Sequence, residues 1–448
     1  MYVRTNLHIL IAMIKQIIFA VILLLTIALL GYSFYRVYRF FKLTRPAFKI
    51  KAHGKRLNLL MTVAFGQSKI FRWPFTGLMH ALVFWGFIVI TIGSIEMVVD
   101  GLAGTHRAFG VLGPVYNVII GSGDIFAAVV LIAIVIFLAR RLVLNIRRFK
   151  GVELKKRSKQ DAILALSFIL LLMVSLLGMN AGYIGLYEGK AAFEGVYPVS
   201  DWLYGSFLSN LSSQELNLVH EVNWWAHIIL IFAFANVLPY SKHFHVFTSL
   251  PNVYLSRLNP VGKMNTMEEV KLEVEMMMNP EAAHDSPSEE LASFGISDAE
   301  HITWKNYLDS LSCTQCGRCT SVCPANQTGK ILSPRKIMVD TRARMKERGP
   351  QLVKQGVDAN DGKMLINNFI TEEELWACTS CNACVIECPI NINQLELILE
   401  MRRYLVLEQA KAPGDLSTML TNIENNGAPW QYSAEDRMKW SEELYMNA

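Results

Sequence analysis

Five long apolar runs constrain the fold of this 448-residue chain more than any other feature. About 20 apolar residues in a helix are long enough to cross a hydrocarbon core that is about 30 Å thick. Inside such a core, only a helix or a closed barrel satisfies its own backbone hydrogen bonds. The sequence therefore predicts five transmembrane helices, at residues 17–34, 78–99, 125–144, 162–177 and 218–240.

The composition supports a membrane part joined to a soluble part. Hydrophobic residues make up 52% of the chain, charged residues make up 18%, and the mean hydropathy is +0.28. One soluble domain would not be this apolar. The net charge of +5 is modest and its basic residues gather beside the apolar runs, so we expect no nucleic-acid partner. The first run is longer than the apolar core of a signal peptide, and we expect it to be a retained span.

The loops between the runs predict an orientation. Residues 36–56 contain eight lysines and arginines, and residues 147–159 contain seven. The two other loops contain one basic residue each, Arg107 and Lys190. Basic loops favour the cytoplasmic side of a membrane. We therefore expect a multi-pass protein of the bacterial inner (cytoplasmic) membrane, with its N-terminus outside and every residue after the fifth run in the cytoplasm.

All eight cysteines lie in two copies of one short pattern. Each copy reads C-x₂-C-x₂-C-x₃-C-P, beginning at Cys313 and at Cys378. This spacing is typical of proteins that carry two [4Fe–4S] clusters, in which the fourth cysteine of each run ligates the other cluster. The predicted ligands of cluster 1 are Cys313, Cys316, Cys319 and Cys388, and those of cluster 2 are Cys378, Cys381, Cys384 and Cys323.

A structural zinc site is the alternative reading of these cysteines. Zinc favours paired C-x₂-C knuckles. It accounts neither for the third cysteine of each run nor for the proline that ends it, so the cluster reading is favoured. Iron–sulfur ligands are free thiolates, which fits a reducing compartment and agrees with the cytoplasmic side that the basic loops predict.

The chain divides into four predicted parts. Residues 1–245 form the membrane domain, 246–300 a linker with a polar, acidic end at 279–290, 301–411 the two-cluster domain, and 412–448 a tail that binds a partner. Ser333 and Pro334 are an N-cap and first residue of a helix through Met345, and a second helix is expected at 392–410. Thr371 and Glu374 form a capping-box pattern. No strand-like alternation occurs, so we expect an all-α fold: a five-helix transmembrane bundle with a cytoplasmic α-helical ferredoxin domain.

Four histidines near the apolar runs are candidate ligands. Ionisable residues inside membrane spans are costly and usually functional. His80 lies in the first turns of the second run, and His243 and His245 follow the inner end of the fifth. Two imidazoles at one depth could hold a haem b, with His80 paired to His245 or, alternatively, to His243. His227 lies in the outer half, where packing, a quinone contact and a second haem remain open. His220 also lies in the outer half of the fifth run, and His8, His53, His106, His284 and His301 are expected to be solvated.

Two stretches around these histidines resemble the respiratory nitrate reductase gamma subunit family. They are His227-x₁₁-Pro239-x₅-His245 and Arg72-Trp73-x₆-His80. The resemblance implies a cytochrome b-like transmembrane domain at 1–245. In that family, a second histidine in the second span helps to hold an outer haem, but Ile90 stands at that position here. The resemblance therefore implies one haem b, on His80 and His245.

The soluble part resembles the C-type iron–sulfur subunit of heterodisulfide reductase. The likeness rests on the cysteine runs, on Gly317 and Trp376 beside them, and on Gly427-Ala428-Pro429-Trp430. Together the two halves resemble fused haem b and iron–sulfur membrane oxidoreductases related to heterodisulfide reductase. That group includes proteins that link electron transfer flavoprotein to quinone.

One departure from these relatives affects the expected function. They usually carry C-C-G domains, whereas this chain has no adjacent cysteines, so we expect a separate C-C-G iron–sulfur subunit or a flavoprotein as its partner. No nucleotide-binding glycine motif is present either. We expect an oxidoreductase subunit with its catalytic end on another polypeptide, passing electrons between the quinone pool and a cytoplasmic redox partner. The alternative is a non-catalytic membrane anchor or scaffold for a soluble dehydrogenase or a C-C-G subunit.

Overall fold

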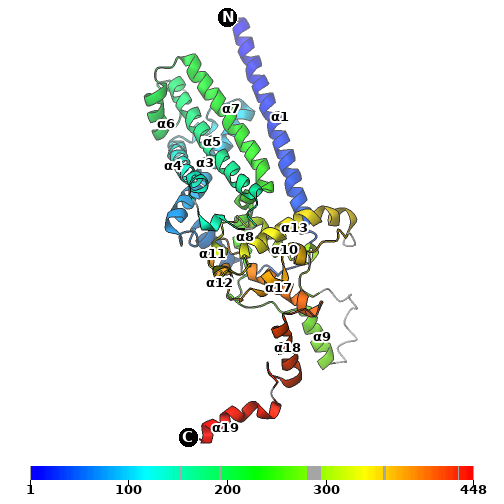
Figure 1. The fold of residues 1–448 in the computed structure, drawn as a ribbon. Helices are drawn as coiled ribbons and strands as arrows, with labels where there is room; N and C mark the ends of the chain where they lie inside the picture. The colour runs from blue at the N-terminus through cyan, green and yellow to red at the C-terminus, as the bar shows by residue number, and fades with distance from the viewer. Residues whose placement is uncertain are drawn as a thin grey trace.

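The computed structural model describes residues 2–144, 146–151, 153–190, 193–279, 294–356, 360–431 and 433–446. Figure 1 shows long helices forming an elongated bundle, a compact helical body at one end of it, and a C-terminal segment that extends further in the same direction. Within the described residues the regular structure is helical, and β pairing is limited to two isolated bridges. The predicted all-α fold class is confirmed.

Five helices are long and apolar enough to cross a membrane. They are α1 (Tyr2–Phe41), α3 (Pro74–Ala103), α4 (Pro114–Leu142), α5 (Lys156–Tyr187) and α7 (Ser213–Val237). The five predicted spans are confirmed, although every helix is longer than its apolar run. Helix α4 begins at Pro114, well before its predicted start at residue 125, and proline is suited to the first turn of a helix. Its early turns were missed because they contain Asp124, which is buried rather than exposed.

Helices α3, α4, α5 and α7 pack against one another, and α1 lies along one side of the group (Figure 1). Small residues permit close approach. A methyl group on Gly182 of α5 would lie 2.9 Å from the backbone nitrogen of His220 on α7. The α1 helix is held by Phe19, whose ring packs against Trp224 and Phe232 of α7. The outward-facing side chains of α1 are mostly large and apolar, as expected for a lipid-facing surface.

The compact body below the bundle is built mainly from α10 (Trp304–Ser312), α13 (Pro334–Gln355) and α17 (Gln394–Leu407). Ser333 accepts from the backbone nitrogen of Lys336 at the start of α13. The capping box of Thr371 and Glu374 opens α15 (Glu372–Trp376). Both caps agree with the predictions. Helix α13 continues beyond Met345 because its next turns still bury side chains, including that of Leu352.

The segment between the bundle and the body contains two helices, α8 (His245–Tyr254) and α9 (Glu268–Met278). The first is part of the junction: its Asn252 is fully buried and accepts a hydrogen bond from Lys305 Nζ of α10 at 2.9 Å. The predicted acidic stretch at 279–290 lies outside the described residues apart from Asn279. The predicted tail forms α18 (Gly414–Asn426) and α19 (Lys439–Met446), and Trp430 between them is exposed.

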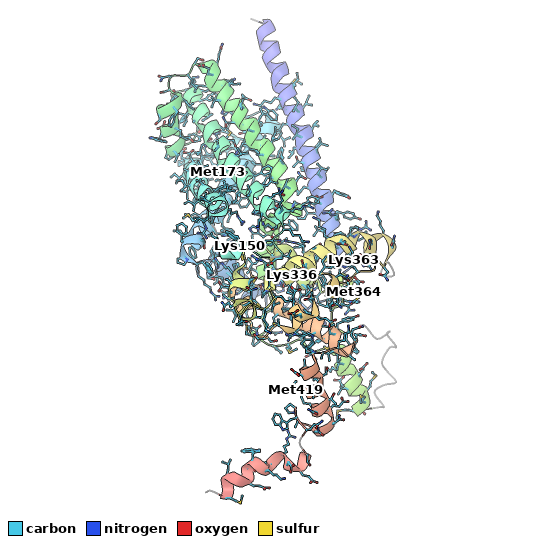
Figure 2. The ribbon with its side chains drawn as sticks, viewed as in Figure 1. Lys150, Met173, Lys336, Lys363, Met364 and Met419 are labelled. Carbon is cyan, nitrogen blue, oxygen red and sulfur yellow. The ribbon has the colours of Figure 1, made fainter. Side chains whose placement is uncertain are left out.

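Loops of the membrane part dock directly on the soluble body. Glu153 and Arg335 form a buried ion pair of 2.7 Å across this junction, and Glu153 also accepts from Ser333 Oγ at 2.8 Å. Figure 2 places Lys150 at the junction, between Met173 in the bundle and Lys336 in the body. The two parts are therefore joined by specific buried contacts as well as by the connecting chain.

Candidate metal and cofactor sites

The two cysteine runs adopt similar local structures. Cys313 caps the C-terminus of α10, and Gly317 starts α11 (Arg318–Ser321) in the left-handed region, at φ 78°. In the second run, Asn382 starts α16 (Ala383–Glu387) at φ 60°, and Cys388 caps its C-terminus. Each run is thus a loop, a short helix and a cysteine at or just after the end of that helix.

The fourth cysteine of each run lies beside the first three of the other run. The Cys388 thiol interacts electrostatically with those of Cys313 and Cys316, and the Cys319 thiol with all three. We call these four residues the Cys313 set. The other four interact in the same way, and we call them the Cys378 set: Cys323, Cys378, Cys381 and Cys384. Cys319 also interacts with Cys384, so the two sets are neighbours.

The chemistry of these thiols fits metal binding. Burial raises the pKa of the Cys319 thiol well above its ordinary value, and the neighbouring thiolates raise it further. Burial likewise raises the pKa of Cys384 and of Cys388 to about 12. Four thiolates this close therefore need positive charge among them to stay ionised, which iron would supply.

The arrangement suits a cluster better than a single ion. Among the described residues, no three histidine, cysteine or acidic side chains converge on one ion position. Zinc needs four ligands at about 2.0–2.3 Å from one centre. In a [4Fe–4S] cluster each thiolate binds a different iron, so the thiols stand further apart. Backbone N–H groups also point at sulfur: Ile392 N lies 3.3 Å from Cys388 Sγ, and Ser380 N 3.4 Å from Cys378 Sγ.

The two sets differ in exposure. In the Cys313 set, Cys313, Cys319 and Cys388 are buried and Cys316 is half-buried. The Cys378 set includes Cys381, which is exposed. The Cys378 set is therefore the one that a soluble protein can approach.

The structure brings His80 and His245 together at the end of the bundle that faces the thiols. The two imidazoles interact electrostatically across the junction of α3 and α8. His80 Nδ1 lies 3.2 Å from Gln67 Oε1, and His245 Nδ1 lies 3.4 Å from the Lys242 carbonyl oxygen. Since both Nδ1 atoms face protein acceptors, each Nε2 atom is available to a metal.

His243 lies beside this pair but is engaged elsewhere. Its Nδ1 atom is 3.0 Å from Ser241 Oγ, and its ring is 5.9 Å from the ring of His245. Burial lowers the pKa of His243 well below its ordinary value, and the charges of His245 and Lys242 add to this effect. The main electrostatic contacts of His80 include His245 but not His243.

His227 lies inside the bundle, ten residues before the end of α7 at Val237, which is about 15 Å along the helix at about 1.5 Å per residue. It is 1% exposed, and its Nδ1 atom lies 3.0 Å from Ser175 Oγ and 2.9 Å from the Leu172 carbonyl oxygen. His227 and Ile90 line the same cavity, whose volume is about 30 Å³. That space would hold about two water molecules.

Several residues that contact these sites were not identified from the sequence. Gln67 precedes the second span and carries no motif. Arg318 donates to the carbonyl oxygens of Lys69 (2.9 Å) and Ile70 (3.1 Å), and so ties the first cysteine run to the loop before His80. His301, expected to be solvated, is half-buried, with Nδ1 2.8 Å from Ser297 Oγ. Only the tertiary contacts reveal these roles.

The opposite end of the bundle contains a buried polar network. Arg107 donates to Asn180 Oδ1 at 2.8 Å and lies 3.8 Å from Glu96. In the sequence, Arg107 was only a single basic residue in an outer loop. Its guanidinium also stacks over Tyr183 at 4.7 Å. Beside it is a cavity of about 110 Å³, lined in part by Lys15, Asp100, His220 and Trp224.

Residues 103–263 match the nitrate reductase gamma subunit family, and residues 309–392 match the 4Fe-4S dicluster domain. The first match includes His227, His243 and His245 but begins after His80. Together with the five spans, these matches define the class: the chain is an iron–sulfur oxidoreductase-like electron-transfer protein of the membrane.

Curated relatives agree with this class. The chain is 29% identical over 418 residues to a protein of Bacillus subtilis (strain 168) described as a probable iron-sulfur-binding oxidoreductase, FadF, covering 87% of this chain and 55% of that protein. It is 27% identical over 412 residues to the EtfAB:quinone oxidoreductase of Syntrophomonas wolfei, covering 87% and 54%.

The cluster domain alone has archaeal relatives. It is 36% identical over 107 residues to the C-type subunit of a CoB-CoM heterodisulfide reductase from Methanosarcina acetivorans, covering 24% of this chain and 52% of that one. The chain spans about half the length of the curated relatives that it matches over most of its residues. No solved structure matches. The expected resemblance, a nitrate reductase gamma-like domain joined to a heterodisulfide reductase C-like domain, is confirmed.

Proposed function

We propose that this protein passes electrons between the quinone pool and a cytoplasmic redox partner, through two [4Fe–4S] clusters and one haem b. The observation that carries the proposal is a direct contact between the first cysteine run and the loop before the helix of His80. Arg318, inside the first cysteine run, binds the loop that leads into the helix of His80. The thiol sets and the imidazoles of His80 and His245, which interact electrostatically, therefore lie near the same end of the bundle.

In this proposal, the Cys313 set and the Cys378 set each hold one cluster. The crossed grouping of the thiols supports it, because the fourth cysteine of each run interacts electrostatically with thiols of the other run. When bound, the clusters and the haem would supply one-electron chemistry, while the protein supplies their positions and the charges around them.

His80 and His245 are the proposed haem ligands. His243 is the weaker candidate, since its ring nitrogen faces Ser241. We propose a packing role for His227, because Ser175 and Leu172 hold it and Ile90 lies across its small cavity. A single haem therefore accounts for the histidines that the structure brings together.

Two observations support the proposed quinone link and soluble partner: the name of a relative and the exposure of one cysteine. A relative that matches 87% of the chain is named EtfAB:quinone oxidoreductase. The exposed Cys381 gives a flavoprotein or a C-C-G iron–sulfur subunit a place to exchange electrons. The basic loops favour a cytoplasmic location, in a bacterium, for the side of the membrane that carries the thiol sets. They also favour an N-terminus outside the cytoplasm.

Spectroscopy of the purified full chain tests the proposal. A reducible b-type absorption band and two [4Fe–4S] signals are expected, and His80→Ala should remove the band while keeping both signals. His227→Ala is the matched control and should keep the band. Adding a quinol to membranes should also reduce the haem. A chain that retains both clusters but has no haem band, and does not respond to quinol, would instead be the anchor or scaffold for a soluble dehydrogenase.

A further inference from the structure

Three arginines gather around the Cys313 set, and we call them the inner arginines: Arg148, Arg318 and Arg342. Arg318 stands between Cys316 and Cys319 in the chain and is 6% exposed. Its guanidinium lies over the ring of Trp73 at 5.5 Å. It is therefore a buried positive charge placed between the thiols and the helix of His80, with which it interacts electrostatically.

The other two inner arginines reach the same thiols from different elements. Arg148 comes from the loop after α4, lies over Trp73 at 4.7 Å, and interacts with the charges of Cys316 and Arg318. Arg342 comes from α13, donates to the Cys313 carbonyl oxygen at 3.1 Å, and interacts with the Cys313 thiol. Gly317 allows this approach, since a methyl group there would lie 2.9 Å from the Arg148 carbonyl oxygen.

The inner arginines have no carboxylate within 4 Å in the part of the chain that the structure describes. The acids nearby already have partners. Asp161, which interacts electrostatically with Arg342, accepts from Lys242 N at 3.0 Å. Glu153 pairs with Arg335, and Glu387 accepts from Trp73 Nε1 at 2.9 Å and lies 3.5 Å from Arg72. Holding like charges this close together is unfavourable unless an anion lies among them. The Cys313 thiolates are the anion that the geometry offers.

The Cys378 set has much less positive charge around it. Arg402 is the cation that interacts with the Cys378 thiol. It donates to the Cys378 carbonyl oxygen, and its guanidinium lies 4.9 Å from the centre of the Trp376 ring. Direct N–H···S contacts do not separate the sets, since both receive several: backbone N–H groups reach Cys313 and Cys388 in one set, and Cys378 and Cys384 in the other. Water near the exposed Cys381 stabilises added negative charge, but mobile water does so less strongly than fixed charges in a buried site.

We propose that Arg148, Arg318 and Arg342 make the cluster of the Cys313 set more easily reduced than that of the Cys378 set. Adding one electron adds one negative charge, which nearby cations stabilise, and the net charge of the surroundings sets cluster potentials. This inference rests on the proposed function. It makes the Cys378 set the entry point and the Cys313 set the relay next to His80.

The electron balance is simple, because no bond forms or breaks. The Cys378 set would hold the cluster that takes one electron from a reduced flavoprotein or iron–sulfur protein. The Cys313 set would hold the cluster that takes this electron next and so reoxidises the first. A haem held by His80 and His245 would be the following acceptor, so the downhill direction would run from the soluble side into the membrane.

A redox titration of the full chain, followed by electron paramagnetic resonance, tests the order. Cys381→Ser alters an exposed ligand and so identifies the signal of the Cys378 set. The other signal is expected to be reduced first in the unchanged protein. Arg318→Gln should lower its reduced-to-oxidised ratio about tenfold at a fixed potential, a shift of about 59 mV for one electron. Arg402→Gln is the matched control and should shift only the Cys378 set.

The outcomes are distinct. If Arg318→Gln does not fold, Arg342→Gln and Arg148→Gln test the same charge effect, and Arg318→Lys should keep the potential near that of the unchanged protein. Reduction of the Cys378 set first, or equal shifts of both signals in Arg318→Gln and Arg402→Gln, would overturn the order while leaving the proposed function intact. A chain without two cluster signals would overturn the proposed function, and the order with it.

Discussion

The Nδ1 atom of His80 lies 3.2 Å from the side-chain oxygen of Gln67. Gln67 is buried, has a left-handed backbone at φ 53°, and donates its own amide to the Ala64 carbonyl oxygen. Its amide oxygen is therefore held toward the histidine. A hydrogen bond of this kind sets which ring nitrogen carries the proton and turns the other toward a metal.

We expect Gln67→Leu to weaken haem binding by about 10- to 100-fold, the usual effect of losing a partner of a metal-ligating histidine. Haem titration into the apoprotein, followed by the b-type band, measures this change. Gln67→Glu keeps an acceptor for the Nδ1 proton and should retain haem. Ligation of haem by residues other than His80 would be indicated if Gln67→Leu bound haem normally.

The crossed thiol sets predict crossed effects of substitution. Cys388→Ser should perturb the cluster that depends on Cys313, Cys316 and Cys319, and Cys323→Ser should perturb the other, because each lies among the thiols of the opposite run. Electron paramagnetic resonance of each variant, compared with Cys316→Ser and Cys381→Ser, assigns the signals. If Cys388→Ser instead matched Cys381→Ser, each run would hold its own cluster.

The buried pair of Glu153 and Arg335 should stabilise the junction. Breaking such a pair leaves one charge buried without a partner, at a cost of about 3–5 kcal/mol. We expect Arg335→Met or Glu153→Met to lower the unfolding free energy of the soluble body by about that amount, and the double variant to recover part of it. Denaturant unfolding of the purified protein measures all three. Additive losses in the double variant would show that the two residues do not interact.

His301 predicts a pH dependence of stability. Burial, reinforced by the charge of Arg45, lowers its pKa from 6.5 to about 4. The unfolded chain therefore binds a proton at a higher pH than the folded one, so this contribution is present above pH 6.5 and is lost as the pH falls from about 6.5 toward 4. The drop in melting temperature between pH 7 and pH 5 should be smaller in His301→Gln. An equal drop in both proteins would show that His301 does not titrate in this window.

Local patterns predicted the spans and two helix caps well. Long apolar runs indicate helices in a membrane because, apart from closed barrels, no other structure satisfies the backbone there. The starts of α13 and α15 follow from the N-caps Ser333 and Thr371. The predicted start of α4 was wrong for a physical reason. The start of α4 was missed because Asp124 looked like a surface residue, whereas the bundle buries it against the backbone nitrogens of Val199 and Ser200.

By itself, the sequence determined that the chain has five apolar spans and two runs of cluster-type cysteines, since both depend on residue type and spacing alone. The sequence also predicted the pairing of His80 with His245 and of each fourth cysteine with the opposite run, and in the structure these side chains interact electrostatically. Only the tertiary structure surrounded one thiol set with the inner arginines and placed Gln67 beside His80. Those relations join residues that are far apart in the chain. Their strength depends on burial and on the distance between charges, which no linear pattern records.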